Sequence, residues 1–215
     1  MKVLVVALAL TALTACAPDP PAAVVGIVVD SCDPGLDQGS GVLVAPGLAL
    51  TSAHVLAGAQ AITVDHDAGS SDGTIVGFDP EMDLAYVSFA APRRQPMPVA
   101  GERVAEGDDG VVYVVRDDEV VVLPATVTRR VNIDTEDIYI QGETTRPGIE
   151  IQADIEFGDS GGALVVDGRV VGVIWARSNR FPGRAYAIDP VRAGDRIERQ
   201  LATGDLGDVD VTRCH

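Results

Sequence analysis

Short apolar stretches separated by turn residues recur along most of the chain, and they constrain its fold more than any other feature. Between residues 24 and 89 there are six such stretches, with turn signals about every 8–12 residues. This spacing is typical of an all-β barrel or sandwich. The segment 91–110, rich in Pro, Arg, Gly and acidic residues, is predicted to connect two halves of the chain.

Further strands are predicted after this segment, where apolar stretches resume. The candidates are 111–115, 120–127, 138–140, 149–152, 163–166, 170–175 and 184–188. The remainder of 132–148 is charged and less regular, so we predict that it is mostly loop. Asp189 before Pro190 is typical of a helix N-cap with proline in the first turn, and Gly204 ends the predicted helix.

Composition limits the classes of function. The chain has 215 residues, enough for one domain or two small barrels that share an interface, and its many Val, Gly and Thr residues favour β structure. Its 32 acidic and 16 basic residues give a formal net charge of -16. Such a surface repels phosphate backbones and anionic headgroups, which argues against nucleic-acid binding. No CxxC pair or His/Cys cluster indicates a metal, and no cofactor is predicted.

The first residues have the pattern of an export signal. Lys2 supplies a positive charge, residues 3–12 are apolar, and Leu13-Thr14-Ala15-Cys16 is similar to the lipobox of bacterial lipoproteins. We therefore predict a signal peptide at 1–15, lipidation of Cys16, a linker at 16–21 and a membrane-anchored protein facing the periplasm or the cell exterior. The alternatives are an ordinary secretory signal with a chance cysteine and a transmembrane span, but the apolar run is short for a span.

Two cysteines remain once Cys16 is set aside, namely Cys32 and Cys214. An oxidising compartment would allow them to pair, and two free thiols are the alternative. A bond between them would tie the start of the fold to its last residues.

A serine lies between glycines in Gly158-Asp159-Ser160-Gly161-Gly162. Glycine permits a tight turn that presents one hydroxyl with backbone N–H groups beside it, as acyl transfer requires for a nucleophile and an oxyanion hole. A glycine-rich hairpin turn is the alternative. The two interpretations differ in whether the rest of the chain supplies a base and a carboxylate.

His54 is the best-placed base, because it directly follows an apolar stretch and has small and apolar neighbours. His66 lies in a charged, turn-like segment, and His215 is the last residue. The alternative role for His54 is that of a buried structural histidine.

Asp83 is the candidate carboxylate that would orient this base, since it opens the apolar stretch 83–87. Asp79 and Glu81 are competitors, but Asp79 precedes a proline and is better suited to shape a turn. The chain thus holds a base, a carboxylate and a nucleophile in that order.

These three motifs carry a resemblance to a known family. Thr51-Ser52-Ala53-His54, Asp83-Leu84-Ala85 and residues 158–162 occur in the order found in trypsin-like serine proteases of the chymotrypsin fold. The short interval between the first two resembles the compact bacterial branch that includes HtrA-type proteases. Residues 78–85 and 153–162, with the cysteine pair, resemble more closely the MarP-type periplasmic proteases of mycobacteria. The resemblance covers most of the chain after residue 22.

The resemblance implies an all-β fold of two six-stranded antiparallel β-barrels with a short C-terminal helix. The barrels would span 22–98 and, with the helix, 111–203, with a connector at 99–110 and a tail at 204–215. The triad of His54, Asp83 and Ser160 would meet in the cleft between the barrels, and the backbone N–H groups of Gly158 and Ser160 would form the oxyanion hole. A disulfide between Cys32 and Cys214 is implied as well.

A substrate pocket is also implied. Asp154 would lie at its floor, Trp175 on a strand along the cleft, and Gly183 and Arg184 in another wall. These residues would favour a basic or small side chain before the cut bond, although Arg184 could pair with Asp154 and neutralise it. In zymogen-activated relatives the matching aspartate pairs with a new N-terminus, which an acylated Cys16 cannot supply. Either Asp159 has another partner or the linker is cleaved.

We therefore predict a serine endopeptidase that cleaves protein or peptide substrates through an acyl-enzyme, touching the membrane only through its lipid anchor. The main alternative is a catalytically silent peptide-binding or structural lipoprotein on the same fold. The intact triad discriminates between them, since silent relatives usually lose one member. A disulfide-stapled surface adhesin would explain the acidity but neither His54 nor Asp83.

Overall fold

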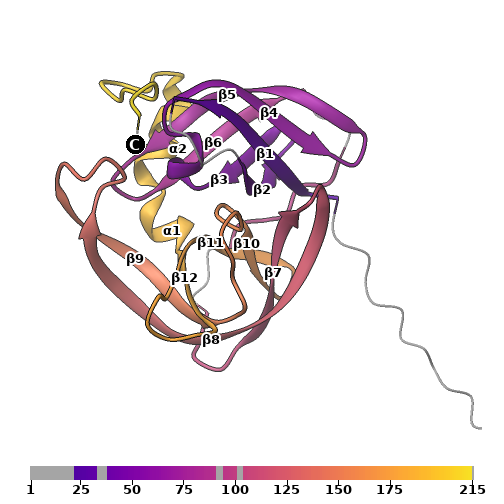
Figure 1. Cartoon of the computed structure of the whole chain (residues 1–215), viewed down its shortest axis with the longest axis vertical. Helices are drawn as coiled ribbons and strands as arrows, with labels where there is room; N and C mark the ends of the chain where they lie inside the picture. The colour runs from indigo at the N-terminus through magenta and orange to yellow at the C-terminus, as the bar shows by residue number, and fades with distance from the viewer. Residues whose placement is uncertain (1–21, 33–37, 91–93, 101–103, 215) are drawn as a thin grey trace, which may run out of the picture.

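Two closed six-stranded barrels, one stacked on the other, make up most of the computed structural model (Figure 1). The structure describes residues 22–32, 38–90, 94–100 and 104–214. The predicted signal peptide, Cys16 and the linker lie outside these residues.

The first barrel closes in the strand order β1-β2-β3-β6-β5-β4, and neighbouring strands are antiparallel. A 3-10 helix, η1 (Ala53–Leu56), follows its third strand. The strands of this barrel are β1 (Val24–Ser31), β2 (Gln38–Ala45), β3 (Leu48–Thr51), β4 (Ala59–His66), β5 (Gly69–Asp79) and β6 (Leu84–Phe89).

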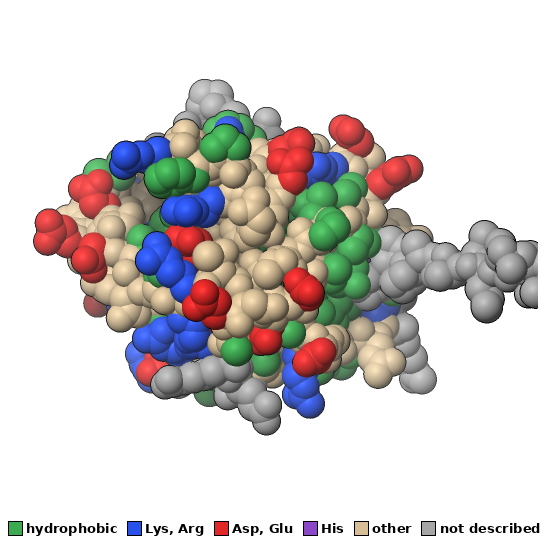
Figure 2. Space-filling view, turned by 90° about the horizontal axis from the view of Figure 1, so that it is seen from below, with side chains coloured by type: hydrophobic (Ala, Val, Ile, Leu, Met, Phe, Trp, Pro, Cys, Tyr) green, Lys and Arg blue, Asp and Glu red, His purple; other side chains and the backbone are tan. Residues whose placement is uncertain are grey.

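The second barrel closes in the order β10-β11-β12-β9-β8-β7, again antiparallel, which confirms the predicted fold. In Figure 2 this barrel faces the reader, with acidic and basic side chains scattered over it and several of the basic ones on the left. Its strands are β7 (Asp109–Arg116), β8 (Glu119–Glu136), β9 (Glu143–Gln152), β10 (Ala163–Val166), β11 (Arg169–Arg177) and β12 (Arg184–Ile188).

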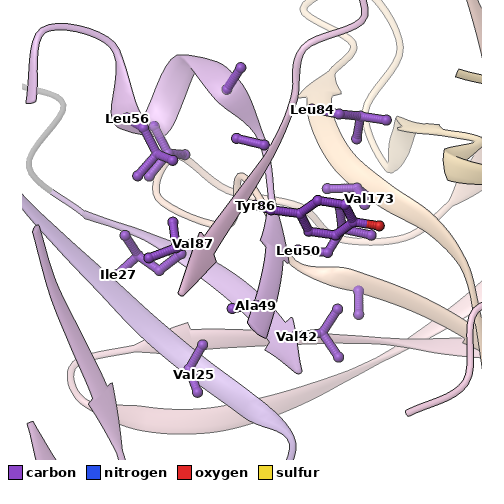
Figure 3. Packing of buried hydrophobic residues seen from close by; sticks show 14 of the residues in the cluster. Val25, Ile27, Val42, Ala49, Leu50, Leu56, Leu84, Tyr86, Val87 and Val173 are labelled. Carbon is purple, nitrogen blue, oxygen red and sulfur yellow. The ribbon is translucent and has the colours of Figure 1, made fainter. Parts of the chain in front are cut away.

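Apolar side chains fill both barrels, because successive residues of a strand point to opposite faces. Ile27, Leu50 and Phe78 of the first barrel are fully buried. Val173 of β11, in the second barrel, belongs to the same apolar cluster as Leu50 and Tyr86 (Figure 3). The two barrels therefore share an apolar interface, which fixes the position of one relative to the other.

Residues 132–148 differ from the loop predicted there. β8 continues to Glu136, a turn occupies 137–142, and β9 starts at Glu143, so that the two strands form a long hairpin. The predicted strand 138–140 lies within the turn. Most side chains near this end of the hairpin are at least partly exposed on both faces, so the sequence there lacks the apolar alternation from which strands are recognised.

The C-terminal helix is interrupted near its start. Asp189 caps α1 (Pro190–Ala193) by accepting hydrogen bonds from two backbone N–H groups of its first turn, as its position before proline predicts. Gly194 separates this turn from α2 (Asp195–Thr203). Gly204 ends α2 in the left-handed conformation, with φ of 69°.

The helix α2 returns to the first barrel and packs on β5 and β6 (Figure 1). Its Gln200 side chain accepts a hydrogen bond from the Phe78 N–H (2.7 Å) and donates one to the Phe78 carbonyl (3.2 Å). The Tyr86 hydroxyl donates to Glu198 over 2.7 Å. Neither α1 nor α2, nor any other helix in the described part of the chain, is long and apolar enough to cross a membrane.

The disulfide implied by the resemblance joins Cys32, just after β1, to Cys214, with their Cα atoms 5.8 Å apart. The C-terminal tail that it holds lies against the segment after η1, where the Gly58 N–H donates to the Val211 carbonyl (3.2 Å). The bridge spans 182 residues of sequence and therefore restricts the unfolded chain strongly.

Replacing both Cys32 and Cys214 with serine is expected to lower the free energy of unfolding by about 2–5 kcal/mol, the usual cost of losing a native disulfide in a small secreted domain. Urea unfolding followed by circular dichroism measures this loss. Wild-type protein with reductant should match the double variant. A variant as stable as oxidised wild type would contradict the prediction.

Candidate active site

His54 lies in η1, and its ring faces the turn that precedes β6. Its Nδ1 lies 2.8 Å from Asp83 Oδ2, and its backbone N–H donates to Asp83 Oδ1, also over 2.8 Å. One residue thus engages both carboxylate oxygens, which fixes the ring relative to its own backbone. An Nδ1–H that donates to a carboxylate leaves Nε2 of the neutral ring as a proton acceptor.

Asp83 is buried and has φ of 56°, a left-handed conformation that few residues other than glycine adopt. Asp79, its competitor in the sequence, shapes the preceding turn by accepting hydrogen bonds from two backbone N–H groups (3.0 and 3.1 Å). Burial opposes ionisation of Asp83, but the attraction of His54 and Arg146 outweighs it and holds its pKa below the ordinary value. The carboxylate that contacts His54 is therefore ionised.

Ser160 lies in the turn before β10, where two glycines are required. Gly158 has φ of 93°. Gly161 has φ of 81°, and a Cβ there would lie 2.0 Å from the Ser40 carbonyl oxygen. The Ser160 carbonyl accepts a hydrogen bond from the Ser40 N–H (2.7 Å), so the turn is fastened to β2 of the first barrel.

A cavity of about 630 Å³ is lined by residues of both barrels. His54, Gly158 and Ser160 all line it. The structure therefore brings the predicted base from the first barrel and the predicted nucleophile from the second to one cavity. The apolar residues that line it are Val55, Ile155, Phe157, Ile174, Trp175 and Ala176.

Asp159 finds its partner in Arg116, the last residue of β7. The guanidinium donates from Nε to Asp159 Oδ1 (2.9 Å) and from Nη2 to Oδ2 (2.6 Å), and the Glu156 N–H also donates to Oδ2 (2.7 Å). Asp159 is 0% exposed. Arg116, a residue of the same barrel, thus takes the place beside Asp159 that a new N-terminus takes in zymogen-activated relatives. Nothing in the local sequence around Arg116 distinguishes it from the other arginines.

Of the four residues predicted to form the substrate pocket, Trp175 alone lines the cavity. Asp154 is exposed between two buried neighbours, because alternate residues of an extended chain point to opposite sides. Arg184 pairs with Glu150 (3.5 Å) rather than with Asp154. Gly183 also lies outside the residues that line the cavity, so the structure does not support a pocket with an aspartate at its floor.

A comparison with families of known proteins matches residues 39–173 to the trypsin-like peptidase domain. The chain belongs to the trypsin-like peptidases. Two serine proteases of Mycobacterium tuberculosis, Rv3671c and MT3772, are each 30% identical to this trypsin-like peptidase over 179 residues, or 82% of the chain. A probable periplasmic DegP-like serine endoprotease of Brucella suis is 30% identical over 184 residues, or 79% of the chain. The resemblance to MarP-type and, more distantly, HtrA-type proteases is confirmed.

Solved structures agree with this assignment. The active form of Rv3671c from M. tuberculosis superposes with a TM-score of 0.77 and 28% identity, covering 90% of this trypsin-like peptidase and 85% of that chain. A serine endoprotease from Yersinia pestis gives 0.69 and 25% identity, covering 85% of this chain and 64% of that one. The chain spans 43% of the length of the mycobacterial relatives and 34% of the Brucella relative.

Within the described ranges of this trypsin-like peptidase, no group of three or more His, Cys, Asp or Glu side chains could hold a metal ion. The chemistry available at the cavity is that of an imidazole paired with an ionised carboxylate, a hydroxyl on a glycine-flanked turn, and the backbone N–H groups of that turn.

Proposed function

We propose that the protein is a serine endopeptidase that hydrolyses peptide bonds through an acyl-enzyme, with Ser160 as nucleophile, His54 as general base and Asp83 as the carboxylate that orients the base. The observation that carries the proposal is the His54–Asp83 pair, 2.8 Å apart, whose histidine lines the same cavity as Ser160. Membership of the trypsin-like peptidases supports the same assignment.

The reaction begins when the carbonyl carbon of the substrate reaches the Ser160 hydroxyl. His54 Nε2 takes the hydroxyl proton while Oγ attacks the carbon, and the imidazolium is stabilised by the Asp83 carboxylate. The imidazolium then gives its proton to the leaving amine as the C–N bond breaks. A water molecule, activated by His54 in the same way, hydrolyses the ester and restores the free hydroxyl.

The oxyanion of each tetrahedral intermediate is held by the backbone N–H groups of Gly158 and Ser160. Gly158 lines the cavity, and its φ of 93° directs the chain around the serine. The ion pair between Asp159 and Arg116 supports this arrangement, because it holds the residue between the two donors. Donors fixed before the reaction stabilise the developing charge without reorganisation.

The cavity favours an apolar side chain before the cut bond. Ile155, Ile174 and Ala176 present hydrocarbon to it, and burying a charged side chain among them without a partner is costly. Glu156 is 63% exposed at the cavity, and its carboxylate lies 3.5 Å from Arg116, which offsets its charge. This preference replaces the basic or small side chain expected from Asp154.

A peptide-library cleavage profile of the protein tests both activity and preference. We expect cleavage after aliphatic residues to exceed cleavage after Arg or Lys by about tenfold or more. The reason is that burying a charged side chain without a partner costs at least the free energy to which a tenfold ratio of rates corresponds. The Ser160→Ala protein, screened in parallel, controls for contaminating proteases. A profile dominated by Arg and Lys would contradict the apolar pocket, and the absence of all cleavage would contradict the enzyme.

The enzyme acts outside the cytoplasm in this proposal, anchored through lipid on Cys16. Three observations support export: the lipobox-like Leu13-Thr14-Ala15-Cys16, the disulfide between Cys32 and Cys214, and the name of the Brucella relative as a periplasmic endoprotease. Disulfides persist in exported proteins and are rare in the cytosol. The substrates are therefore proteins or peptides of the periplasm or cell surface.

A further inference from the structure

Arg146 is a buried cation of the second barrel that reaches into the first. It lies on β9, near the far end of the long β8–β9 hairpin, which rises from the second barrel toward the first (Figure 1). Its side chain is only 3% exposed. A charged group is rarely buried to this degree unless its hydrogen bonds are met, so its contacts indicate its role.

The contacts of Arg146 converge on the turn that presents Asp83. Its Nε donates to the Glu81 carbonyl over 2.7 Å, and Nη2 lies 3.5 Å from the Pro80 carbonyl. The same Nη2 donates to the Glu136 carbonyl of its own hairpin (3.1 Å). One planar guanidinium therefore ties the hairpin of the second barrel to the turn of the first, which a point charge such as lysine could not do in the same geometry.

The remaining nitrogen, Nη1, lies 4.0 Å from Asp83 Oδ2. This separation is too long for a hydrogen bond, so the interaction is one between charges. Both oxygens of Asp83 are engaged by His54, and Arg146 is the arginine whose charge acts on this carboxylate. The charged groups that face Arg146 are Asp83, Asp79 and Asp137, and burial lowers the pKa of its guanidinium, which nevertheless stays protonated in proteins.

One further contact supports the same turn, and another supports Arg146 itself. The Ile138 N–H, at the tip of the hairpin, donates to the Pro80 carbonyl over 3.0 Å. The Arg146 guanidinium carbon lies 4.9 Å from the centre of the Trp175 ring, and Trp175 lines the active-site cavity. Asp83 has an unfavourable φ of 56° and needs neighbours that hold its turn in place.

We propose that Arg146 is a positioning residue for catalysis: from the second barrel it holds the turn that presents Asp83 and balances the charge of that carboxylate, so that the catalytic pair is complete only when the two barrels are docked. The proposal rests on the proposed function of Asp83 and His54. In this proposal the β8–β9 hairpin forms part of the barrel wall and also places the Arg146 guanidinium next to the turn that presents Asp83.

Arg146→Met and Arg146→Lys separate the two parts of this role. We expect Arg146→Met to lower kcat by about 100-fold, as a displaced catalytic group does. The acid limb of its kcat/KM profile should also move to higher pH, because an unbalanced Asp83 favours the protonated imidazole of His54. Arg146→Lys keeps the positive charge but loses the planar set of N–H donors that the guanidinium has. We therefore expect kcat to fall by about tenfold, with the acid limb of the kcat/KM profile unchanged.

All rates are measured with an aliphatic fluorogenic peptide and divided by the concentration of active sites titrated with a fluorophosphonate. Arg130→Met is the matched control, because Arg130 also pairs with a buried carboxylate, that of Asp189 (2.7 Å), and neither residue lines the cavity. It should lose stability but keep the wild-type kcat and pH profile. Thermal unfolding of every variant shows whether it is folded.

An Arg146→Met protein with the wild-type kcat and acid limb would overturn the proposal and leave the proposed function intact. If Arg146→Met does not fold, Arg146→Lys decides: a reduced kcat supports the proposal and a wild-type kcat overturns it. Wild-type protein that neither labels nor cleaves would instead overturn the proposed function.

Discussion

Replacing Ser160 with alanine is expected to abolish covalent labelling by a fluorophosphonate and to lower kcat for peptide cleavage by about 10⁶-fold, the loss seen when a triad serine is removed. The reason is chemical, since among the described residues that line the cavity with His54, Ser160 is the only one that carries a hydroxyl. In-gel fluorescence measures the labelling, and a fluorogenic peptide measures the rate.

The control for this experiment is Ser88→Ala, which removes a hydroxyl from β6 that makes one long hydrogen bond to the Thr74 carbonyl (3.4 Å). It should label and cleave as wild type does. The Ser160→Ala protein should also keep the wild-type unfolding midpoint, because Ser160 lines the cavity and its side chain is not fully buried. Labelling that persists at wild-type level in Ser160→Ala would show that another residue is the nucleophile.

Replacing Arg116 with methionine is expected to lower kcat by about 100- to 1,000-fold, the range for losing an oxyanion-hole donor. The buried Asp159 carboxylate would lose its guanidinium and draw in water or another donor, which displaces the adjoining N–H groups of Gly158 and Ser160. We also expect a loss of about 3 kcal/mol in the free energy of unfolding, the lower end for breaking a buried pair, since Arg116 is 26% exposed.

The double variant Arg116→Met, Asp159→Asn distinguishes a lost ion pair from lost packing. The double variant has no unpaired buried charge. Its unfolding midpoint should therefore lie closer to that of wild type than to that of Arg116→Met alone. Arg192→Met is the matched control, because Arg192 makes one exposed hydrogen bond to Asn132 (3.2 Å) and neither residue lines the cavity. Wild-type kcat in Arg116→Met would show that the turn keeps its shape without the cation.

The parts of the fold that the sequence predicted depend on local patterns. Strands such as β3 and β6 alternate or concentrate apolar residues, and turn residues bound them. The cap of α1 is a contact between neighbours in sequence, between Asp189 and the next two backbone N–H groups. The long hairpin at 132–148 was missed because its exposed end leaves no apolar pattern.

The residues of the candidate site also fall into those that a local sequence pattern predicts and those that only distant contacts reveal. Ser160, His54 and Asp83 could be selected because each lies in a short motif with glycines, small residues or an apolar run beside it. Arg116 and Arg146 could not, because their partners are 43 and 63 residues away in the sequence (159 − 116 and 146 − 83) and neither arginine has a distinctive neighbour. Asp154 was assigned to the pocket by position alone, and the alternation of the extended chain turns it to the surface.

The sequence by itself determined the β-rich class, the turn chemistry around Ser160 and the identity of the residues that can carry out acyl transfer, because these depend on residue type and on near neighbours. Only the tertiary structure decided which arginine neutralises Asp159, which one supports Asp83, and which side chains line the cavity. These choices follow from how two closed barrels pack against each other, and a buried charge accepts whatever partner that packing brings within a few ångströms.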